Sequence, residues 1–416
     1  MGNNSGLSRR SVLSSLLAGG TATVLGVATA DKSANALSNY TSESKVHANW
    51  SIPFDPAATR PHWYPRDLPT PGEVIHEYNM EVLLTPHEIL PLVQFPAYAY
   101  NGIVPGPELR VTEGDWIKVN LLNKTHDFHT IHWHGLEVEC EMDGVPFGTQ
   151  YPVGYNQTFQ YLFRAQPAGT HFYHCHQMTN LHVQAGLYGV IIVESPDDPV
   201  RKQFPYTRDY TLVLSEVDTN FVEEQINSMQ LMGAQMDYMS RSPTMMAKMS
   251  GEMMGWFASK DAFMAAIKSG WIPPYVSSMA GKFRQIQPNF FMINGKSYPM
   301  TEHISIRSGE LIRVRLVGAG MMPHFMHLHG HDFWHVCQDG APLQNPVRLN
   351  TVPVFPGTTS DIIIEGTNPG NWHFHDHSDL CLTNNGASPG GMMTMLMYED
   401  AAAAGFKFNE IITLNS

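Results

Sequence analysis

The sequence predicts an all-β protein with two tandem Greek-key β-sandwich or barrel domains and a Met-rich, helical insert between them. Two observations predict this fold. The first is an internal repeat, in which "YNGIVPGPELRVTEGDWIKVNLLN" (100–123) returns as "INGKSYPMTEHISIRSGELIRVRLVG" (293–318), and "PAGTHFYHCH" (167–176) returns as "NPGNWHFHDH" (368–377). The second is the pattern within each copy, where short alternating strand-like runs are separated by Gly/Pro turns.

The repeat and the shifts in composition divide the chain into five parts. We expect a signal peptide over 1–36, an N-terminal arm rich in Ser, Asn and Pro over 37–72, and the first β domain over 73–200. A linker strand and the Met-rich insert follow over 201–284, and the second β domain covers 285–416.

The N-terminus has the pattern of a twin-arginine export signal. "SRRSVL" (8–13) precedes an apolar run of small residues, and small-x-small sites follow at 28–30 and 34–36. An uncleaved membrane anchor is the alternative. A twin-arginine route carries folded cargo, so we expect a periplasmic or extracellular protein without a membrane span in its mature form.

The insert is marked by its methionines. They recur at helical spacing at Met229, Met232, Met236 and Met239, and continue at Met245, Met246, Met249, Met253, Met254 and Met264. An ordinary packing face explains this pattern, because Met fills gaps in cores well. A surface of soft thioether ligands for a metal ion is the alternative.

Composition limits the partners and the chemistry. The formal net charge of −13 argues against nucleic acid and against an anionic membrane surface. The four cysteines, at positions 140, 175, 337 and 381, are too sparse for a disulfide scaffold, and we expect the three other than Cys175 to be buried thiols.

Histidines gather in four clusters: "HTIHWHG" (129–135), "HFYHCHQMTNLH" (171–182), "HFMHLHGH" (324–331) and "HFHDH" (373–377). These hold six His-x-His pairs, whereas random placement of 21 histidines gives about one. In a β-strand, side chains two positions apart point to the same face. Each pair therefore presents two imidazoles side by side, as a metal site requires.

Cys175 lies between His174 and His176, so its side chain points to the opposite face of the strand. One strand can then serve a metal ion on each side. A thiolate with two imidazoles is typical of a blue-copper site, and many further histidines without Cys or carboxylate suit a cluster of copper ions. Zinc is the main alternative, although a structural zinc site needs only four ligands.

The four segments, in this order, resemble those of the multicopper oxidases, the family of laccases, ascorbate oxidase and copper-efflux oxidases. "HWHGLEVECEMDGVP" and "HFMHLHGHDF" carry the resemblance best, and it covers both β domains. It implies cupredoxin-like domains and four copper ions per chain: one type 1, one type 2 and two type 3. It implies that type 1 copper takes His129, Cys175 and His182, with Leu187 in the axial position. It assigns type 2 copper to His132 and His327, and the type 3 pair to His134, His174, His176, His329, His375 and His377.

The second copy departs from the first at the position of the thiolate. Asp376 stands there, so we expect no blue site in the second domain, although His324 survives at the place of a former ligand. This is similar to two-domain, laccase-like oxidases with type 1 copper in domain 1. The spacing from Cys175 to His182 is longer than is usual in laccases.

The eight cluster histidines divide evenly between the two domains, so the cluster must form where a first domain meets a second one. In two-domain relatives this junction lies between subunits of a homotrimer. The resemblance thus implies that the active site exists only in the oligomer.

The implied reaction is oxidation of a reducing substrate, one electron at a time, with four-electron reduction of O₂ to water. Electrons enter at type 1 copper and pass through Cys175. Asp143 in "EMDGVP" matches the family's acidic residue beside the cluster, and we expect it to relay protons. A plain turn residue is the alternative, since Asp-Gly favours turns.

The substrate is open at this point: a phenol or amine, or Cu(I). Two other functions remain possible. Copper nitrite reductase shares the scaffold, but it needs fewer histidines than this chain supplies. A periplasmic copper-storage or electron-carrier protein has no oxidase activity, and oxygen uptake separates it from the oxidase.

Overall fold

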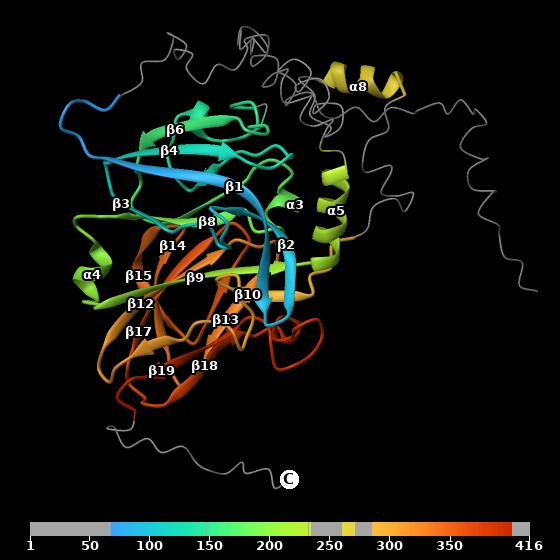
Figure 1. Ribbon diagram of the computed structural model, residues 1–416. Helices are drawn as coiled ribbons and strands as arrows, with labels where there is room; N and C mark the ends of the chain where they lie inside the picture. Colours follow the sequence, from blue (N-terminus) through green and yellow to red (C-terminus); the bar gives the residue numbers. More distant parts are fainter. Residues whose placement is uncertain (1–67, 147, 232, 234–259, 271–284, 402–416) are drawn as a thin grey trace, which may run out of the picture. The chain divides into compact units, whose positions relative to one another are not determined.

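The computed structural model describes residues 68–146, 148–231, 233, 260–270 and 285–401 (Figure 1). The expected export signal, most of the arm and most of the Met-rich insert lie outside these residues. All described residues belong to one unit, 53–416. None of the described helices combines the length and the apolarity that a bilayer crossing requires.

The first domain consists of two four-stranded sheets packed on a shared core. In one sheet the strands follow the order β2 (Val93–Tyr100), β1 (Ile75–Leu90), β4 (Trp116–Asn123) and β6 (Thr158–Arg164). In the other the order is β3 (Leu109–Thr112), β8 (Tyr188–Glu194), β7 (Gly169–His174) and β5 (His132–His134).

Burial in the first domain follows the period of two that the sequence predicts. On β4 the alternate residues Ile117, Val119 and Leu121 are fully buried, and they join one core with Trp133 of β5. Both sheets therefore direct their apolar faces inward. This packing holds β5 and β7, the two strands that carry the histidines of the first domain, in place.

The second domain repeats this plan with a larger pair of sheets. One sheet follows the order β10 (Phe290–Ile293), β9 (Arg208–Val217), β12 (Leu311–Gly318), β17 (Thr359–Glu365), β14 (Phe333–Gln338) and β15 (Ala341–Leu349). The other follows β11 (Ile304–Ile306), β19 (Met393–Tyr398), β18 (Asn371–Asp376), β13 (His324–Leu328) and β16 (Thr351–Val354). The all-β fold with two domains is confirmed.

The linker strand β9 belongs to the second domain's sheet. It pairs parallel with β12 and antiparallel with β10, from Arg208 to Val217. A domain boundary at residue 285 leaves this strand outside the sheet in which it hydrogen-bonds, because the insert separates β9 from β10 in sequence but not in space.

The helices within the described residues are short and lie between strands. They are α3 (Thr179–His182), α4 (Pro199–Gln203), α5 (Thr219–Leu231) and α8 (Lys260–Lys268), with the 3-10 turns η1 (Cys140–Met142) and η2 (Asp379–Leu382). The described parts of the insert, α5 and α8, are thus helical, as the Met spacing predicts. Met229 in α5 is half-buried and Met264 in α8 is exposed; the other insert methionines lie outside the described residues.

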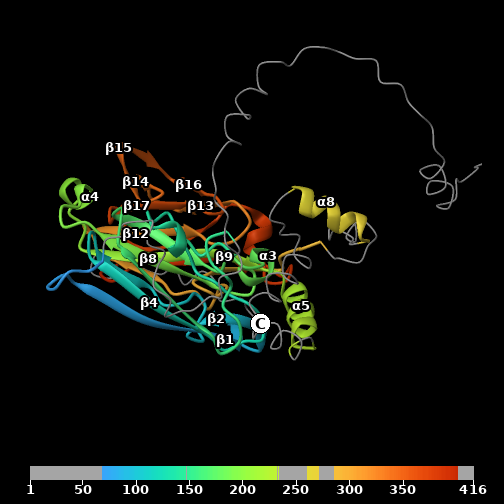
Figure 2. The ribbon, with the colours of Figure 1, turned by 90° about the horizontal axis from the view of Figure 1, so that it is seen from above.

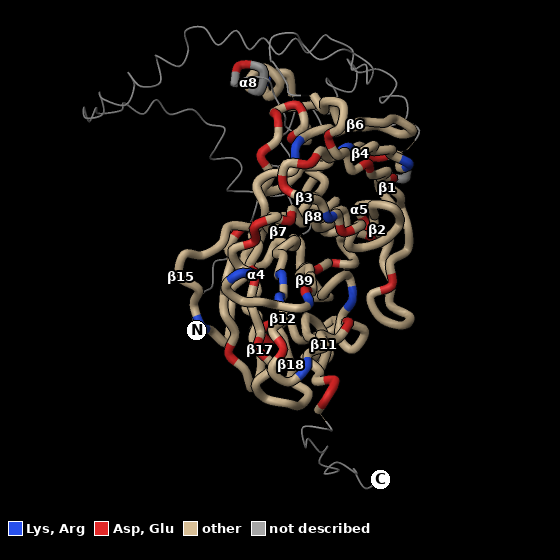
Figure 3. Tube along the Cα trace, turned by 90° about the vertical axis from the view of Figure 1, so that its left-hand side faces the viewer, with Lys and Arg blue, Asp and Glu red and all other residues tan. Residues whose placement is uncertain are grey.

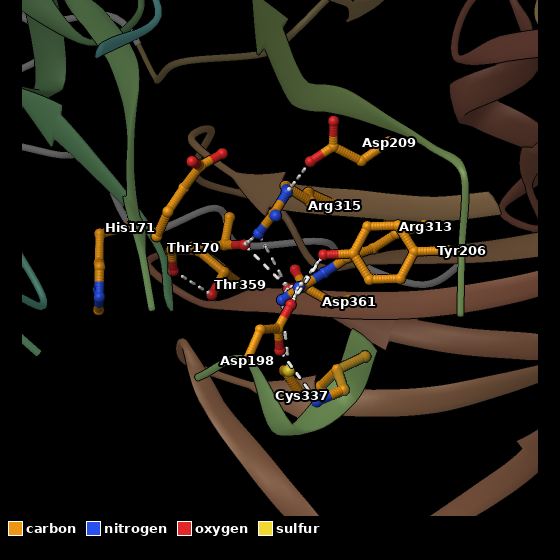
Figure 4. A network of polar contacts seen from close by, with 12 residues as sticks. Thr170, His171, Asp198, Tyr206, Asp209, Arg313, Arg315, Cys337, Thr359 and Asp361 are labelled. Carbon is orange, nitrogen blue, oxygen red and sulfur yellow. Dashed lines mark hydrogen bonds and ion pairs between the residues drawn. The ribbon is translucent and has the colours of Figure 1, made fainter. Parts of the chain in front are cut away.

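A buried polar network joins β7 of the first domain to the second domain (Figure 4). Asp361 of β17 is fully buried and accepts hydrogen bonds from Arg313 and, at 2.9 Å, from the hydroxyl of Thr170. Arg315 donates to Thr170 Oγ1 at 2.7 Å and to Asp209 at 3.0 Å. Because these charges are buried with partners in both domains, the network fixes β7, the strand that ends at His174.

Acidic residues dominate the charge of the chain. Asp and Glu number 38 against 25 Lys and Arg, and Figure 3 shows them spread over both domains.

Candidate metal centre

The structure brings the thiol of Cys175 together with two imidazoles. Its Sγ atom lies 3.3 Å from Nδ1 of His182 and 3.7 Å from Nδ1 of His129. All three side chains are fully buried, and their ligand atoms lie within 4.8 Å of one another. A His₂Cys set of this kind is the donor set of a blue-copper site.

The longer spacing from Cys175 to His182 is absorbed by α3. Met178 takes a left-handed conformation at φ 44°, and the backbone N–H of His182 then donates to Met178 O at 2.9 Å. One helical turn therefore returns His182 to the thiol despite the added residues.

Two polar side chains orient the imidazoles. Asp127 Oδ2 lies 2.9 Å from Nε2 of His182, and Thr125 Oγ1 lies 2.7 Å from Nε2 of His129. The ring of Tyr98 packs edge-on against both imidazoles, at 5.0 and 5.2 Å between centroids. Because these partners hold Nε2, each ring presents Nδ1 to the sulfur, which is how hydrogen bonds commonly orient metal-binding histidines. No motif or period in the sequence singles out Asp127, Thr125 or Tyr98.

The two imidazoles of the site, His129 and His182, differ in the direction of their pKa shifts. Burial, with the neighbouring His182 ring, holds the pKa of His129 well below its usual range. Burial also opposes charge on His182, but Cys175 and Asp127 outweigh it and raise the pKa of His182 to about 10. A metal ion that binds Nδ1 of His182 must therefore displace any proton held there.

Leu187 is joined to this set by two backbone hydrogen bonds. Cys175 N donates to Leu187 O at 3.0 Å, and Leu187 N donates to His182 O at 3.0 Å. The side chain is fully buried and apolar, so it supplies no ligand atom in the axial position.

Four further histidines of the first domain lie together beside this site. β5 and β7 pair so that His132 faces His174, and the ring of His132 lies 5.3 Å from both His174 and His176. The His134 ring lies 5.7 Å from that of His174. All four are half-buried, on the face of the strand opposite to Cys175.

The second domain holds the matching four. β13 and β18 pair so that His327 faces His375, and Nε2 of His329 lies 2.9 Å from Nε2 of His375. The ring of His377 lies 5.4 Å from that of His327. His329 and His377 are exposed, so this half is more open than the first.

The hydrogen bonds of these rings leave nitrogen lone pairs for a metal ion. Four of them donate Nδ1–H to backbone carbonyls at 2.7 to 3.0 Å: His132 to Asp143, His174 to Cys175, His327 to Asn350 and His375 to Asp376. Among the described residues, Nδ1 of His134 and of His176 finds no hydrogen-bond partner, and both atoms are buried. Such orphaned nitrogens fit a metal-ligand set, because buried polar atoms otherwise find partners.

Two histidines of the first-domain group favour the neutral form. Burial lowers the pKa of His134 to about 4 and that of His174 to about 3, in each case helped by neighbouring imidazoles. A neutral imidazole is the form that binds metal.

The two groups of four do not meet within the chain. No ring contact joins them among the described residues, although His134 does reach the second domain, where it lies against Gly357. Each chain therefore carries one half of an eight-histidine set in each domain.

Asp143 lies beside the first group. Its Oδ1 is 3.2 Å from Nδ1 of His132, and its own backbone carbonyl accepts from the same atom at 2.8 Å. The carboxylate is one-third exposed. Of the other cysteines, Cys337 and Cys381 are buried as expected; Cys140 is exposed, so the expectation of a buried thiol is wrong there, because η1 lies on the surface.

Comparison with known proteins agrees with this donor set. Residues 85–198 and 271–400 each match a sequence profile of the multicopper oxidases. The chain belongs to the multicopper oxidase family. Copper is thus its cofactor, and the donor atoms described above fit copper.

Similar multicopper oxidases include proteins from bacteria. The chain is 33% identical to the blue copper oxidase from Nitrosomonas europaea, covering 78% of this chain and 86% of that one, with a TM-score of 0.62. It is 29% identical to the multicopper oxidase mgLAC, covering 82% and 90%, with a TM-score of 0.63.

A curated relative is copper resistance protein A of Pseudomonas syringae pv. tomato, at 26% identity over 65% of this chain and 43% of that protein. The chain thus spans less than half the length of the curated copper resistance proteins it matches.

Proposed function

We propose that this multicopper oxidase is laccase-like: it couples one-electron oxidation of a reducing substrate to the four-electron reduction of O₂ to water. One observation carries the proposal. Cys175 belongs to a buried His₂Cys set on one face of its strand, while His174 and His176 belong to the histidine group on the other face. Copper supplies the one-electron chemistry on both faces when bound.

The chain's own atoms connect the two faces. His174 and His176 are the direct sequence neighbours of Cys175, and Nδ1 of His174 donates to Cys175 O at 3.0 Å. The path from the thiolate to the first histidine group therefore consists of a few covalent bonds and one hydrogen bond. This arrangement favours the oxidase over copper nitrite reductase and over a storage protein.

The complete site is proposed to form between subunits of a homotrimer. Each chain holds two separate groups of four histidines, and the second-domain group exposes His329 and His377. An exposed group of imidazoles that is half of a site needs a second copy to complete it. The site would then hold four copper ions per chain: one type 1, one type 2 and two type 3.

Asp143 is proposed as the proton relay for O₂ reduction. Its carboxylate lies 3.2 Å from His132, and its partial exposure gives water access to it. The backbone carbonyl of the same residue fixes the His132 ring at 2.8 Å. A turn residue can thus position one ligand and carry protons at the same place.

The electron donor is proposed to be a small reducing molecule or Cu(I), with O₂ as acceptor and no nucleic-acid partner. For Cu(I), one observation is specific: the Met-rich insert begins beside the type 1 loop. α3, which carries His182, and α5 lie side by side in Figures 1 and 2, and Asp218 N donates to Gln184 Oε1 at 3.0 Å. Relatives that are named copper resistance protein A support the same substrate. The twin-arginine sequence supports export to the periplasm or beyond.

Copper counting and oxygen uptake test the proposed function. Purified protein is expected to hold about four copper ions per chain, to absorb strongly in the visible range, and to consume oxygen with phenols or with Cu(I). About two copper ions per chain, with nitrite reduction and no oxygen uptake, would instead identify the reductase.

A further inference from the structure

The second domain retains the framework of a type 1 site at the position equivalent to Cys175. Asp376 N donates to Met392 O at 3.0 Å, just as Cys175 N donates to Leu187 O at 3.0 Å. Met392 therefore occupies the place of Leu187.

The same comparison identifies the residue in the place of His182. Met392 N donates to Cys381 O at 2.8 Å, as Leu187 N donates to His182 O at 3.0 Å. Cys381 lies on η2, the counterpart of α3. In the second domain the strand position of Cys175 is occupied by Asp376, and a thiol is instead supplied by Cys381 on the turn that follows.

The side chains converge as the backbone does. Ligand atoms of His324, Asp376 and Cys381 lie within 4.8 Å of one another, and all three residues are fully buried. Nδ1 of His324 lies 2.7 Å from Asp376 Oδ2, so the nitrogen that faces sulfur in the first domain faces a carboxylate here.

We infer that His324, Asp376 and Cys381 bind a Zn²⁺-like divalent cation that takes no part in electron transfer. Zinc accepts imidazole nitrogen, thiolate sulfur and carboxylate oxygen in one site. Glu216 supplies the outer-shell partner, since its Oε2 lies 3.2 Å from Nε2 of His324. Binding releases the thiol proton of Cys381 and any proton on His324 to solvent.

The position of the thiolate explains why this site is inert in electron transfer. Cys175 has cluster histidines on both sides in sequence, whereas Cys381 lies five residues beyond Asp376. The residue between His375 and His377 is the carboxylate. A cation bound to Asp376 therefore holds the end of β18 in place, where His375 and His377 lie. The residue between these two histidines carries no sulfur, so it provides no direct electron path from a thiolate to them.

Cobalt(II) tests the inference because thiolate–Co²⁺ bonds absorb in the near ultraviolet. The full chain with Cys175→Ser is stripped of metal and titrated with Co²⁺ alone, so that the type 1 thiolate cannot contribute. We expect a thiolate–Co²⁺ band that grows to saturation during the titration and disappears when Cys381→Ser is added. Cys337→Ser is the matched control: this buried thiol accepts from Arg313 at 3.6 Å, and its loss leaves the band unchanged.

A second variant covers the case in which Cys381→Ser does not fold. In the Cys175→Ser chain, Asp376→Asn keeps the shape of the side chain and is expected to weaken Co²⁺ binding at least about tenfold. The inference is overturned if the folded Cys175→Ser chain shows no thiolate band, or if the band survives loss of Cys381. The three side chains would then form a hydrogen-bonded network that binds no metal ion. Oxygen uptake is not part of this test, so its outcome is independent of the proposed function.

Discussion

Sγ of Cys175 lies 3.3 Å from Nδ1 of His182, although Cys175 directly follows the end of β7 and His182 is the last residue of α3. The contact depends on Asp127, whose carboxylate holds the far side of the His182 ring at 2.9 Å. The same carboxylate accepts a hydrogen bond from Phe128 N at 2.7 Å, so it is held in a position where it can set the metal affinity of the site.

Asp127→Asn is expected to weaken copper binding at the type 1 site about 10- to 100-fold, because an amide orients the ring but no longer stabilises its charge. A chelator competition that follows the visible absorption measures this affinity. Asp115→Asn is the control, since Asp115 makes a similar contact with His76 at 2.8 Å far from the site. Equal affinity in both variants would contradict the role of Asp127.

If each complete histidine cluster forms between two subunits, two inactive variants can restore activity when they assemble together. His132→Ala with His134→Ala destroys the first-domain group, and His327→Ala with His329→Ala destroys the second. Each variant alone is expected to be inactive. Coexpressed, they are expected to recover about a quarter of the wild-type oxidase activity, because random mixing places an intact first domain against an intact second domain at about a quarter of the interfaces. A site within one chain predicts no recovery.

Asp143→Asn is expected to lower kcat for O₂ reduction about 100-fold with copper content unchanged, because the amide keeps the backbone contact with His132 but carries no proton. Asp143→Glu restores part of the rate. Stopped-flow reoxidation of the fully reduced enzyme across pH measures this step. A loss of copper in Asp143→Asn, or a rate equal to wild type, would show that Asp143 is only a turn residue.

Acid destabilises the network between the domains. Burial alone would raise the pKa of Asp209, but Arg315 and Arg110 lower it below its usual value. Because the folded state then holds the proton less tightly than the unfolded chain, the stabilisation is complete above the unfolded pKa of about 4 and is lost as the pH falls through the lower, folded value.

The Tm of metal-free protein is therefore expected to fall as the pH drops below about 4, and Asp209→Asn to show a weaker fall. Thermal unfolding followed by circular dichroism between neutral pH and acid measures both. Asp197→Asn serves as the control, because Asp197 pairs with Lys202 on the surface. Parallel curves for wild type and Asp209→Asn would contradict the assignment.

The fold and the histidine groups could be predicted because both depend on the two-residue alternation of side chains along a β-strand. His-x-His places two rings on one face of any strand, and the repeat shows that the pattern occurs twice. The pairing of His132 with His174 and of His327 with His375 follows once the strands form sheets.

The roles of Asp127 and Cys381 depend on loops and turns, where side chains follow no regular alternation that a sequence could reveal. Asp127 reaches His182 only because the loop that precedes β5 folds over α3, and nothing in "KTHDFH" distinguishes this carboxylate from a surface one. The sequence predicts Cys381 only as a buried thiol, because the loops after Asp376 and after Cys175 differ too much in sequence for alignment. Their equivalent backbone hydrogen bonds are visible only in three dimensions.

The central claim is that the thiolate of Cys175 carries electrons from the substrate to the histidine cluster. The most direct measurement is the visible spectrum and the oxygen uptake of copper-loaded Cys175→Ser beside wild type, with Cys140→Ser, an exposed cysteine, as control. We expect Cys175→Ser to lose the intense thiolate–copper absorption and at least about 99% of turnover while keeping its cluster copper. Wild-type protein without that absorption, or Cys175→Ser with full turnover, would contradict the claim.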